Sequence, residues 1–197
     1  MWRHERFLTK ASSIPNMRYF VAVDIPESIA TSLVSFQPDS GSKIRLVKPD
    51  QMHITLHYIG AADLETVSKI SQSLEKVKAK SFRISLRGVG TFSTYNKSKV
   101  LWAGVNNLDS LRKLYLAVGE ALSEIDIELE QRKYKPHVTL ARLGRGVPSD
   151  VAKEFIEQGS SLDYQDIPIN RYILYRSSPV NGISHYERIK LFSLDQN

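Results

Sequence analysis

The sequence contains no cysteine, which excludes disulfide bonds, thiolate nucleophiles and cysteine zinc sites. It also has no apolar run that approaches the roughly 20 residues needed to cross a bilayer as a helix. No linker of low complexity divides the chain. We therefore expect a soluble, cytoplasmic protein that has no membrane partner.

The length of 197 residues, with 42% hydrophobic residues, fits one domain or two small lobes that share a core. Residues 1–16 differ from the rest because they are mostly basic in charge and lack the apolar core of a secretory signal. We expect residues 1–16 to be a flexible amino-terminal extension and residues 17–197 to form a single bilobal domain. We expect the protein to be a monomer.

The chain is basic, with a formal net charge of +6 and a pI near 9.4. Basic proteins attract polyanions, since phosphate contacts supply most non-specific affinity for nucleic acids. Many basic proteins bind no nucleic acid, so the charge alone favours an RNA partner only weakly.

One short motif occurs twice. It reads His53-Ile54-Thr55-Leu56 in the first half and His137-Val138-Thr139-Leu140 in the second. These residue types favour an extended backbone, in which residues two apart point to the same face. We therefore expect His53 and Thr55 to share one face of a strand, and His137 and Thr139 to share one face of another. The apolar residues between them would point into a core.

A pair of histidines suits acid-base chemistry near neutral pH, because the pKa of imidazole is close to 6.5. One neutral histidine can activate a water molecule while a second, protonated histidine donates to a leaving oxygen. Threonine hydroxyls can hold phosphoryl oxygens, where charge gathers during transfer. This scheme needs no metal and no cofactor. If the motif occurred once, its histidine could simply be a structural residue of a strand that is hydrogen-bonded to its neighbours. Two copies favour the functional interpretation.

Four further segments carry a family resemblance. They are Arg18-Tyr19-Phe20-Val21-Ala22-Val23-Asp24, Val100-Leu101-Trp102-Ala103-Gly104-Val105, Lys135-Pro136-His137-Val138-Thr139-Leu140-Ala141-Arg142 and Leu174-Tyr175-Arg176-Ser177. With them the chain resembles the two-histidine (2H) phosphoesterases, and most closely the RNA 2′,3′-cyclic phosphodiesterases, also called 2′-5′ RNA ligases. The likeness spans about residues 17–194. Lys135 departs from the usual arginine of the family, and Leu46 from a common tryptophan.

The expected elements are mixed in order, which favours an α+β fold over a purely parallel sheet. We expect strands over 17–24, 44–47, 53–59, 82–89, 99–105, from 137 onward, 167–175 and 186–194, and helices over 27–36, 64–77, 108–123 and 149–157, with Asp63 and Ser149 as caps. The resemblance implies two lobes related by a pseudo-twofold axis, with antiparallel sheets around a central cleft and helices outside.

The other candidate substrate-binding residues are basic or aromatic. Arg142 ends the second histidine strand, although regular alternation turns it away from His137 unless a bulge intervenes. Lys135 keeps a positive charge but lacks the planar fork of arginine. Lys48, Arg145 and Arg176 are further basic candidates, for which a solvated charge is the default interpretation.

Aromatic rings commonly hold the bases of single-stranded RNA by stacking. Tyr95 lies in the polar loop 93–98 and is the better stacking candidate, whereas Phe20 and Tyr58 can be explained by core packing. Alternation from His53 would place His57 on the cleft face. A zinc-protease helix is not indicated there, since the residues around His57 favour a strand.

The hypothesis is a metal-independent phosphodiesterase that opens a terminal 2′,3′-cyclic phosphate on RNA or on a small cyclic nucleotide. The resemblance implies attack by water and departure of the 3′ oxygen, which leaves a 2′-phosphate; His53 is assigned as the acid and His137 as the base. Two alternatives stay open: joining of RNA ends through a 2′-5′ bond, and a non-catalytic module that binds RNA ends.

Overall fold

The computed structural model describes residues 17–93, 99–180 and 183–196. Residues 1–16 and Tyr95 lie outside this part of the chain, so the interpretations that fall on them stay predictions. The strands are β1 (Arg18–Asp24), β2 (Ile44–Leu46), β3 (His53–Gly60), β4 (Phe82–Ser93), β5 (Lys99–Asn106), β6 (His137–Leu143), β7 (Asp163–Ile169), β8 (Arg171–Val180) and β9 (Ile183–Ser193). The helices are α1 (Glu27–Leu33), α2 (Leu64–Leu74), α3 (Leu108–Ser123) and α4 (Ser149–Gln158), with short 3₁₀ turns η1 (Val34–Phe36), η2 (Pro49–Gln51) and η3 (Gly159–Ser161).

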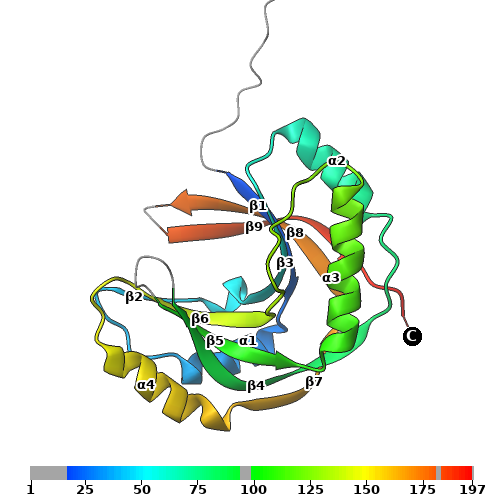
Figure 1. The fold of residues 1–197 in the computed structure, drawn as a ribbon. Helices are drawn as coiled ribbons and strands as arrows, with labels where there is room; N and C mark the ends of the chain where they lie inside the picture. The colour runs from blue at the N-terminus through cyan, green and yellow to red at the C-terminus, as the bar shows by residue number, and fades with distance from the viewer. Residues whose placement is uncertain (1–16, 94–98, 181–182, 197) are drawn as a thin grey trace, which may run out of the picture.

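The strands form one bent sheet that divides into two lobes (Figure 1). Its order is β7-β4-β5-β6-β3-β1-β8-β9, and β2 pairs with β6. The paired strands run antiparallel. The two histidine strands, β3 and β6, therefore lie side by side at the centre, with three strands beyond each. This is the α+β architecture that the mixed element order and the family resemblance predicted.

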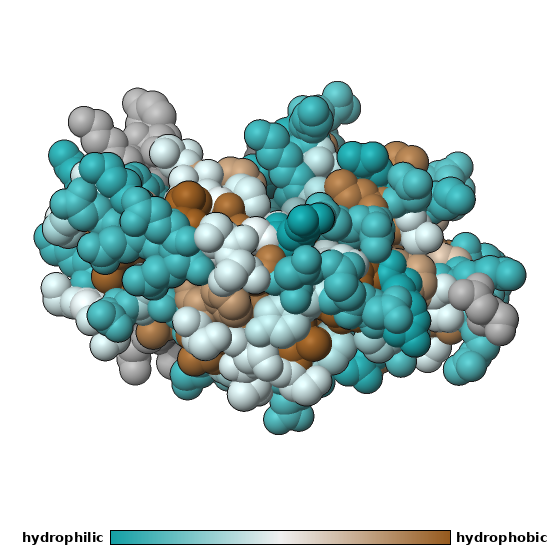
Figure 2. Space-filling view, turned by 90° about the horizontal axis from the view of Figure 1, so that it is seen from below, coloured by the Kyte–Doolittle hydropathy of each residue, from teal (hydrophilic) through white to brown (hydrophobic). Residues whose placement is uncertain are grey.

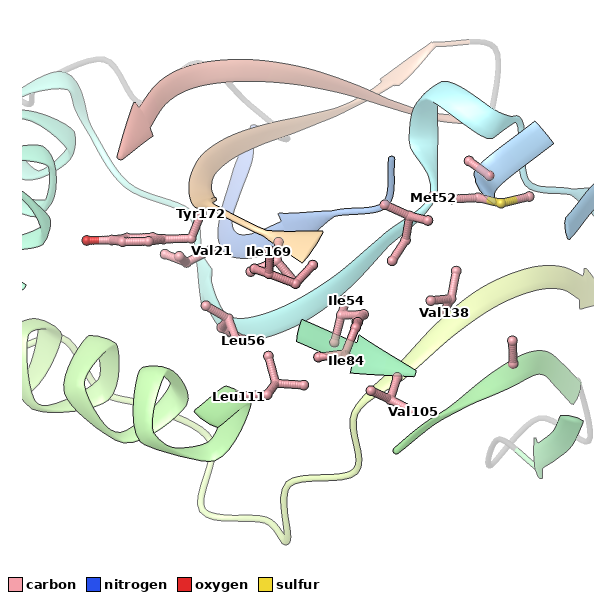
Figure 3. Close-up of a cluster of buried hydrophobic side chains, with 14 of the residues drawn as sticks. Val21, Met52, Ile54, Leu56, Ile84, Val105, Leu111, Val138, Ile169 and Tyr172 are labelled. Atoms are coloured by element: carbon pink, nitrogen blue, oxygen red, sulfur yellow. The ribbon is translucent and has the colours of Figure 1, made fainter. Parts of the chain in front are cut away.

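The helices cover the sheet on the side away from the histidines. In the β3 lobe, the Tyr172 hydroxyl donates to the Leu74 carbonyl of α2 at 2.5 Å, and the Ser73 hydroxyl joins α2 to α3. In the other lobe, α4 packs on β4 and β5. The apolar residues of both motifs enter the core between these layers, where Ile54 and Val138 are fully buried (Figure 3). Burial of each such side chain stabilises the fold by about 1.5–3 kcal/mol.

The face seen in Figure 2 is hydrophilic mainly at its two sides, with residues of intermediate and apolar character between them. Over residues 17–93, 99–180 and 183–196, no helix combines the length and the apolar character that a membrane span requires.

Most expected elements are present, with several corrections. α3 occupies the expected residues, and the Asp63 carboxylate caps α2 by accepting from the Thr66 amide at 2.8 Å. α1 and α2 end earlier than expected, since α1 tightens into η1 and α2 stops at Leu74. Ser149 is no cap, because it is already helical and Pro148 occupies the cap position.

The single strand expected over 167–175 is wrong. Two strands, β7 and β8, meet at Asn170 and belong to opposite lobes. Apolar residues lie on both sides of Asn170, and Ile169 of β7 and Tyr172 of β8 are both buried. A pattern of burial therefore cannot reveal that the chain changes sheet neighbours there.

Candidate active site

The four motif side chains lie together where the lobes meet. Ile54 of β3 pairs with Val138 of β6, and both point into the core. The side chains on either side of this pair therefore face the opposite way, since neighbours in a strand alternate. His53, Thr55, His137 and Thr139 are each half-buried on this face. The antiparallel register sets each histidine across from the threonine of the other motif.

Both imidazoles are held by the same local contact. Nδ1 of His53 lies 2.7 Å from the Gln51 carbonyl oxygen, and Nδ1 of His137 lies 2.7 Å from the Lys135 carbonyl oxygen. A carbonyl oxygen only accepts, so we assign the Nδ1 proton of each neutral ring as the donor. Nε2 is then the unprotonated nitrogen in both rings. Each histidine is thus prepared to take up a proton at Nε2.

Aromatic rings surround each histidine and reduce its contact with water. Ring centroids of Phe20 and Tyr186 lie 4.9 and 5.2 Å from that of His53. On the other strand, Phe92 lies edge-on to His137 at 5.0 Å. Phe20 therefore does not pack in the main core; it belongs to a small cluster beside the histidine.

The pKa of both histidines is lowered in the free protein. Burial is the largest cause, and it lowers the pKa of His53 from 6.5 to about 4. Burial also lowers the pKa of His137. The carbonyl hydrogen bond acts against burial in each case, while the positive charge of Arg142 adds to it. Arg142 thus lies close enough to influence both imidazoles.

A cavity of about 400 Å³ opens beside His53, on the β1, β8 and β9 side of the cleft. Its lining residues come from both lobes and are Arg18, Phe20, His53, Thr55, Tyr58, Arg142, Ser177, Pro179, Ser184 and Tyr186. His137 and Thr139 lie on the adjacent strand β6 rather than in this lining. The volume is within the range typical of small-molecule sites.

A bulge in each histidine strand explains how Arg142 reaches the cavity. In β6, Thr139 pairs with Trp102 but Ala141 pairs with Leu101, which leaves Leu140 as an extra residue. Leu140 and Ala141 are consequently both buried, and Arg142 returns to the face of Thr139. Regular alternation is thus interrupted by a bulge, the alternative that the sequence left open for Arg142.

β3 has the equivalent bulge, with Leu56 as the extra residue between the Val21–His57 and Ala22–Thr55 pairs. His57 therefore faces the core, and the expectation that it lies on the cleft face is wrong. Its Nε2–H donates to the Tyr115 carbonyl at 2.8 Å, and its ring stacks on that of Tyr115. α3 approaches closely here, since a Cβ added to Gly119 would lie 3.0 Å from the His57 ring.

The same bulge brings Tyr58 to the position in β3 that Arg142 has in β6. Tyr58 is 36% exposed and lines the cavity, so its explanation as a core residue is wrong. Sequence reasoning also missed Arg18, Ser177 and Tyr186. Alternation along β1 from Phe20 is the signal that could have found Arg18.

The other basic candidates are not in the cavity lining. Lys135 is exposed, with its ammonium 5.8 Å from the Phe92 ring centroid, while its carbonyl holds His137. Arg176 forms an ion pair with Glu187. Lys48 and Arg145 are exposed outside the lining, as solvated charges would be. In the described part of the chain, no three side chains among His, Asp and Glu gather as a metal site would require.

Comparison with known proteins agrees with this arrangement. A model of the LigT-like phosphoesterase family matches residues 23–102 and again residues 105–184. The chain is 32% identical over 178 residues to an RNA 2′,3′-cyclic phosphodiesterase of Methanocaldococcus jannaschii, a match that covers 88% of this chain and 99% of the relative. It is 29% identical over 189 residues to a Bacillus subtilis protein of the same name, covering 92% of this chain and all of the relative.

Two solved structures share the fold. Escherichia coli LigT, crystallised with 3′-AMP, matches with a TM-score of 0.72 at 22% identity, covering 91% of this chain and 98% of that chain. TT0787 of Thermus thermophilus matches with a TM-score of 0.72 at 24% identity, covering 91% and 99%. The family model covers both halves of the chain, and each half holds one histidine motif. The chain therefore belongs to the LigT-like phosphoesterases and is a hydrolase.

Proposed function

We propose that the protein hydrolyses 2′,3′-cyclic phosphates, at RNA ends or on nucleotides, to 2′-phosphates by metal-independent acid-base catalysis. The observation that carries this proposal is the pair of histidines on adjacent strands, each with Nδ1 bonded to the carbonyl two residues earlier. The names of the relatives support the cyclic phosphate as substrate.

The proposed step uses both Nε2 atoms. His137 takes a proton from water as the water oxygen forms a bond to phosphorus. The bond from phosphorus to the 3′ oxygen breaks on the opposite side, and protonated His53 donates its Nε2 proton to that oxygen. The 2′ oxygen keeps the phosphate. One proton enters at His137 and one leaves from His53, so a proton exchange with solvent restores the pair.

Three neighbouring groups can stabilise the phosphoryl oxygens during this step. The hydroxyls of Thr55 and Thr139 are donors on the same face as the imidazoles, and the Arg142 guanidinium can neutralise charge in the cavity. Preorganised donors of this kind are worth roughly 10²- to 10³-fold in rate when one is removed in other enzymes.

The negative charge of the substrate favours the protonated form of His53 that the proposed step requires. In the free protein, burial and the charge of Arg142 keep both imidazoles neutral near pH 7. A bound phosphate diester carries a negative charge beside them and neutralises Arg142. Both effects raise the pKa of the histidines. Binding of substrate and uptake of a proton are therefore coupled.

The test is to incubate the purified protein with a 2′,3′-cyclic nucleotide in excess chelator and to identify the product by phosphorus NMR. We expect the 2′-monophosphate. A predominant 3′-monophosphate would overturn the assigned acid and base roles. Activity that is lost on chelation and restored by one metal would overturn the metal-independent scheme. A protein that binds a cyclic-phosphate RNA end without turnover would instead be a binding module.

The same assay with an RNA that carries a 5′ hydroxyl tests the ligation alternative. A 5′ hydroxyl in place of water would yield a 2′-5′ joined product from the same site. We expect hydrolysis to dominate, because water is present in large excess over any RNA end.

A further inference from the structure

A second arginine lines the same cavity as Arg142. Arg18 begins β1, pairs with Ser177 of β8, and lies on the same face as Phe20 two residues later. Arg18 is four positions before Ala22 in β1, and Ala22 pairs with Thr55. At about 3.3 Å per residue, the backbone of Arg18 is about 13 Å along the strand from the level of Thr55. Its long side chain spans part of that distance.

Neither cavity arginine has a counter-charge. No carboxylate is among the lining residues, and neither Arg18 nor Arg142 forms an ion pair or hydrogen bond with another described residue. Other arginines on β8 and β9 do have a carboxylate partner. Arg171 and Arg188 both contact the Asp24 carboxylate, and Arg176 pairs with Glu187. Among the described residues, the cavity therefore carries two unpaired positive charges, which a bound anion can balance.

The other groups in the lining suit a nucleoside. Phe20, Tyr58 and Tyr186 supply aromatic surface, and Ser177 and Ser184 supply hydroxyls. Aromatic rings stack on bases, and hydroxyls bond to sugars or bases. An anion at Arg142, a nucleoside beside the rings and a second anion at Arg18 would match the groups at the end of a nucleic acid strand. A cyclic mononucleotide has only the first anion.

We propose that Arg18 binds the phosphodiester that links the terminal nucleotide to the rest of an RNA. The cavity then selects an RNA 3′ end over a free cyclic nucleotide. This inference rests on the proposed function, because it places the terminal cyclic phosphate between the histidines and Arg142.

The test compares kcat/KM for three substrates: a 2′,3′-cyclic mononucleotide, a dinucleotide with the same cyclic end, and that dinucleotide with an uncharged methylphosphonate linkage. In the Arg18→Gln variant, we expect the dinucleotide-to-mononucleotide ratio to fall about tenfold, since a charge-assisted contact is lost. In the wild-type protein, the ratio of kcat/KM for the uncharged dinucleotide to that for the mononucleotide should be lower than the ratio for the charged dinucleotide. This lower ratio should not fall further in the variant.

Arg176→Gln is the matched control, because Arg176 lies on β8 beside Ser177 but points to the other face of the strand. Its ratios should equal those of the wild-type protein. If Arg18→Gln is active and its dinucleotide-to-mononucleotide ratio is unaltered, this inference is overturned but the proposed function is not. The same holds if Arg18→Gln loses kcat/KM equally on the charged and the uncharged dinucleotide. Absence of wild-type turnover on all three substrates would overturn the proposed function and this inference with it.

Discussion

His53 and His137 each experience two opposing effects on the pKa. A carbonyl oxygen at 2.7 Å from Nδ1 favours the protonated ring, whereas the surrounding aromatic rings disfavour it by excluding water. Burial is the larger effect in both, so the free protein holds two neutral imidazoles near pH 7. A bound anion would shift that balance towards the protonated rings.

We predict that anion binding raises the pKa of His53. A proton NMR titration of the free protein should give a value of about 4. The same titration in saturating inorganic phosphate should give a value at least about one unit higher, because the anion neutralises Arg142 and attracts the imidazolium. In Arg142→Gln the free value should rise slightly and the phosphate effect should shrink. A His53 pKa that is the same with and without phosphate would contradict the proposed coupling.

At the scale of the elements, the two bulges decide which side chains face the cavity. The residue types around both motifs were enough to predict the strands and the face of the histidines and threonines. They were insufficient to predict Leu56 and Leu140 as extra residues, since a bulge is defined by the register of the partner strand. His57, Tyr58 and Arg142 lie beyond the bulges, so regular alternation misplaced His57 and Tyr58 and left the face of Arg142 open.

The bulge in β3 predicts different consequences for two histidines four residues apart. His57→Leu should lower the free energy of unfolding by about 1–3 kcal/mol, because the ring stacks on Tyr115 and bonds to its carbonyl in a buried position. Turnover per folded molecule should stay within a few-fold of wild type. Urea unfolding and a cyclic-nucleotide assay measure the two quantities. A large loss of turnover with unchanged stability would contradict the structural role of His57.

At the scale of the whole molecule, two similar halves form one site whose two sides carry different side chains. The mixed element order predicted an α+β fold, and the family resemblance implied two lobes with one histidine strand each. The crossing at Asn170 was not predicted, because buried apolar residues lie on both sides of it and do not show that β7 and β8 belong to different lobes. Nor did the sequence predict that equivalent positions hold Tyr58 and Arg142, which give the cleft an aromatic side and a cationic side.

The lowered histidine pKa values predict how stability depends on pH. The pKa is lowered in the folded state for His53, His57 and His137, so the unfolded chain binds more protons below about pH 6.5. Their contribution is complete above pH 6.5 and is lost as the pH falls, for His53 down to about pH 4. The urea concentration at the midpoint of unfolding should therefore decrease from pH 7.5 to pH 5.5 and again to pH 4.5.

His53→Asn is the control for this prediction, because its side-chain amide can still donate to the Gln51 carbonyl but does not titrate. Its midpoint should fall less over the same pH range than that of the wild-type protein. An equal fall in both proteins would show that His53 contributes nothing to the acid sensitivity.

The most direct test of the central claim is a double-mutant cycle on turnover of a 2′,3′-cyclic nucleotide. His53→Ala and His137→Ala should each lower kcat by roughly 10²-fold or more, because each removes a proton-transfer group. If the two histidines act as one pair, the double variant should be no more than about tenfold slower than the slower single variant. Thermal unfolding of all four proteins checks that they are folded. Near-normal turnover in a folded single variant, or losses that multiply fully in the double variant, would contradict the paired mechanism.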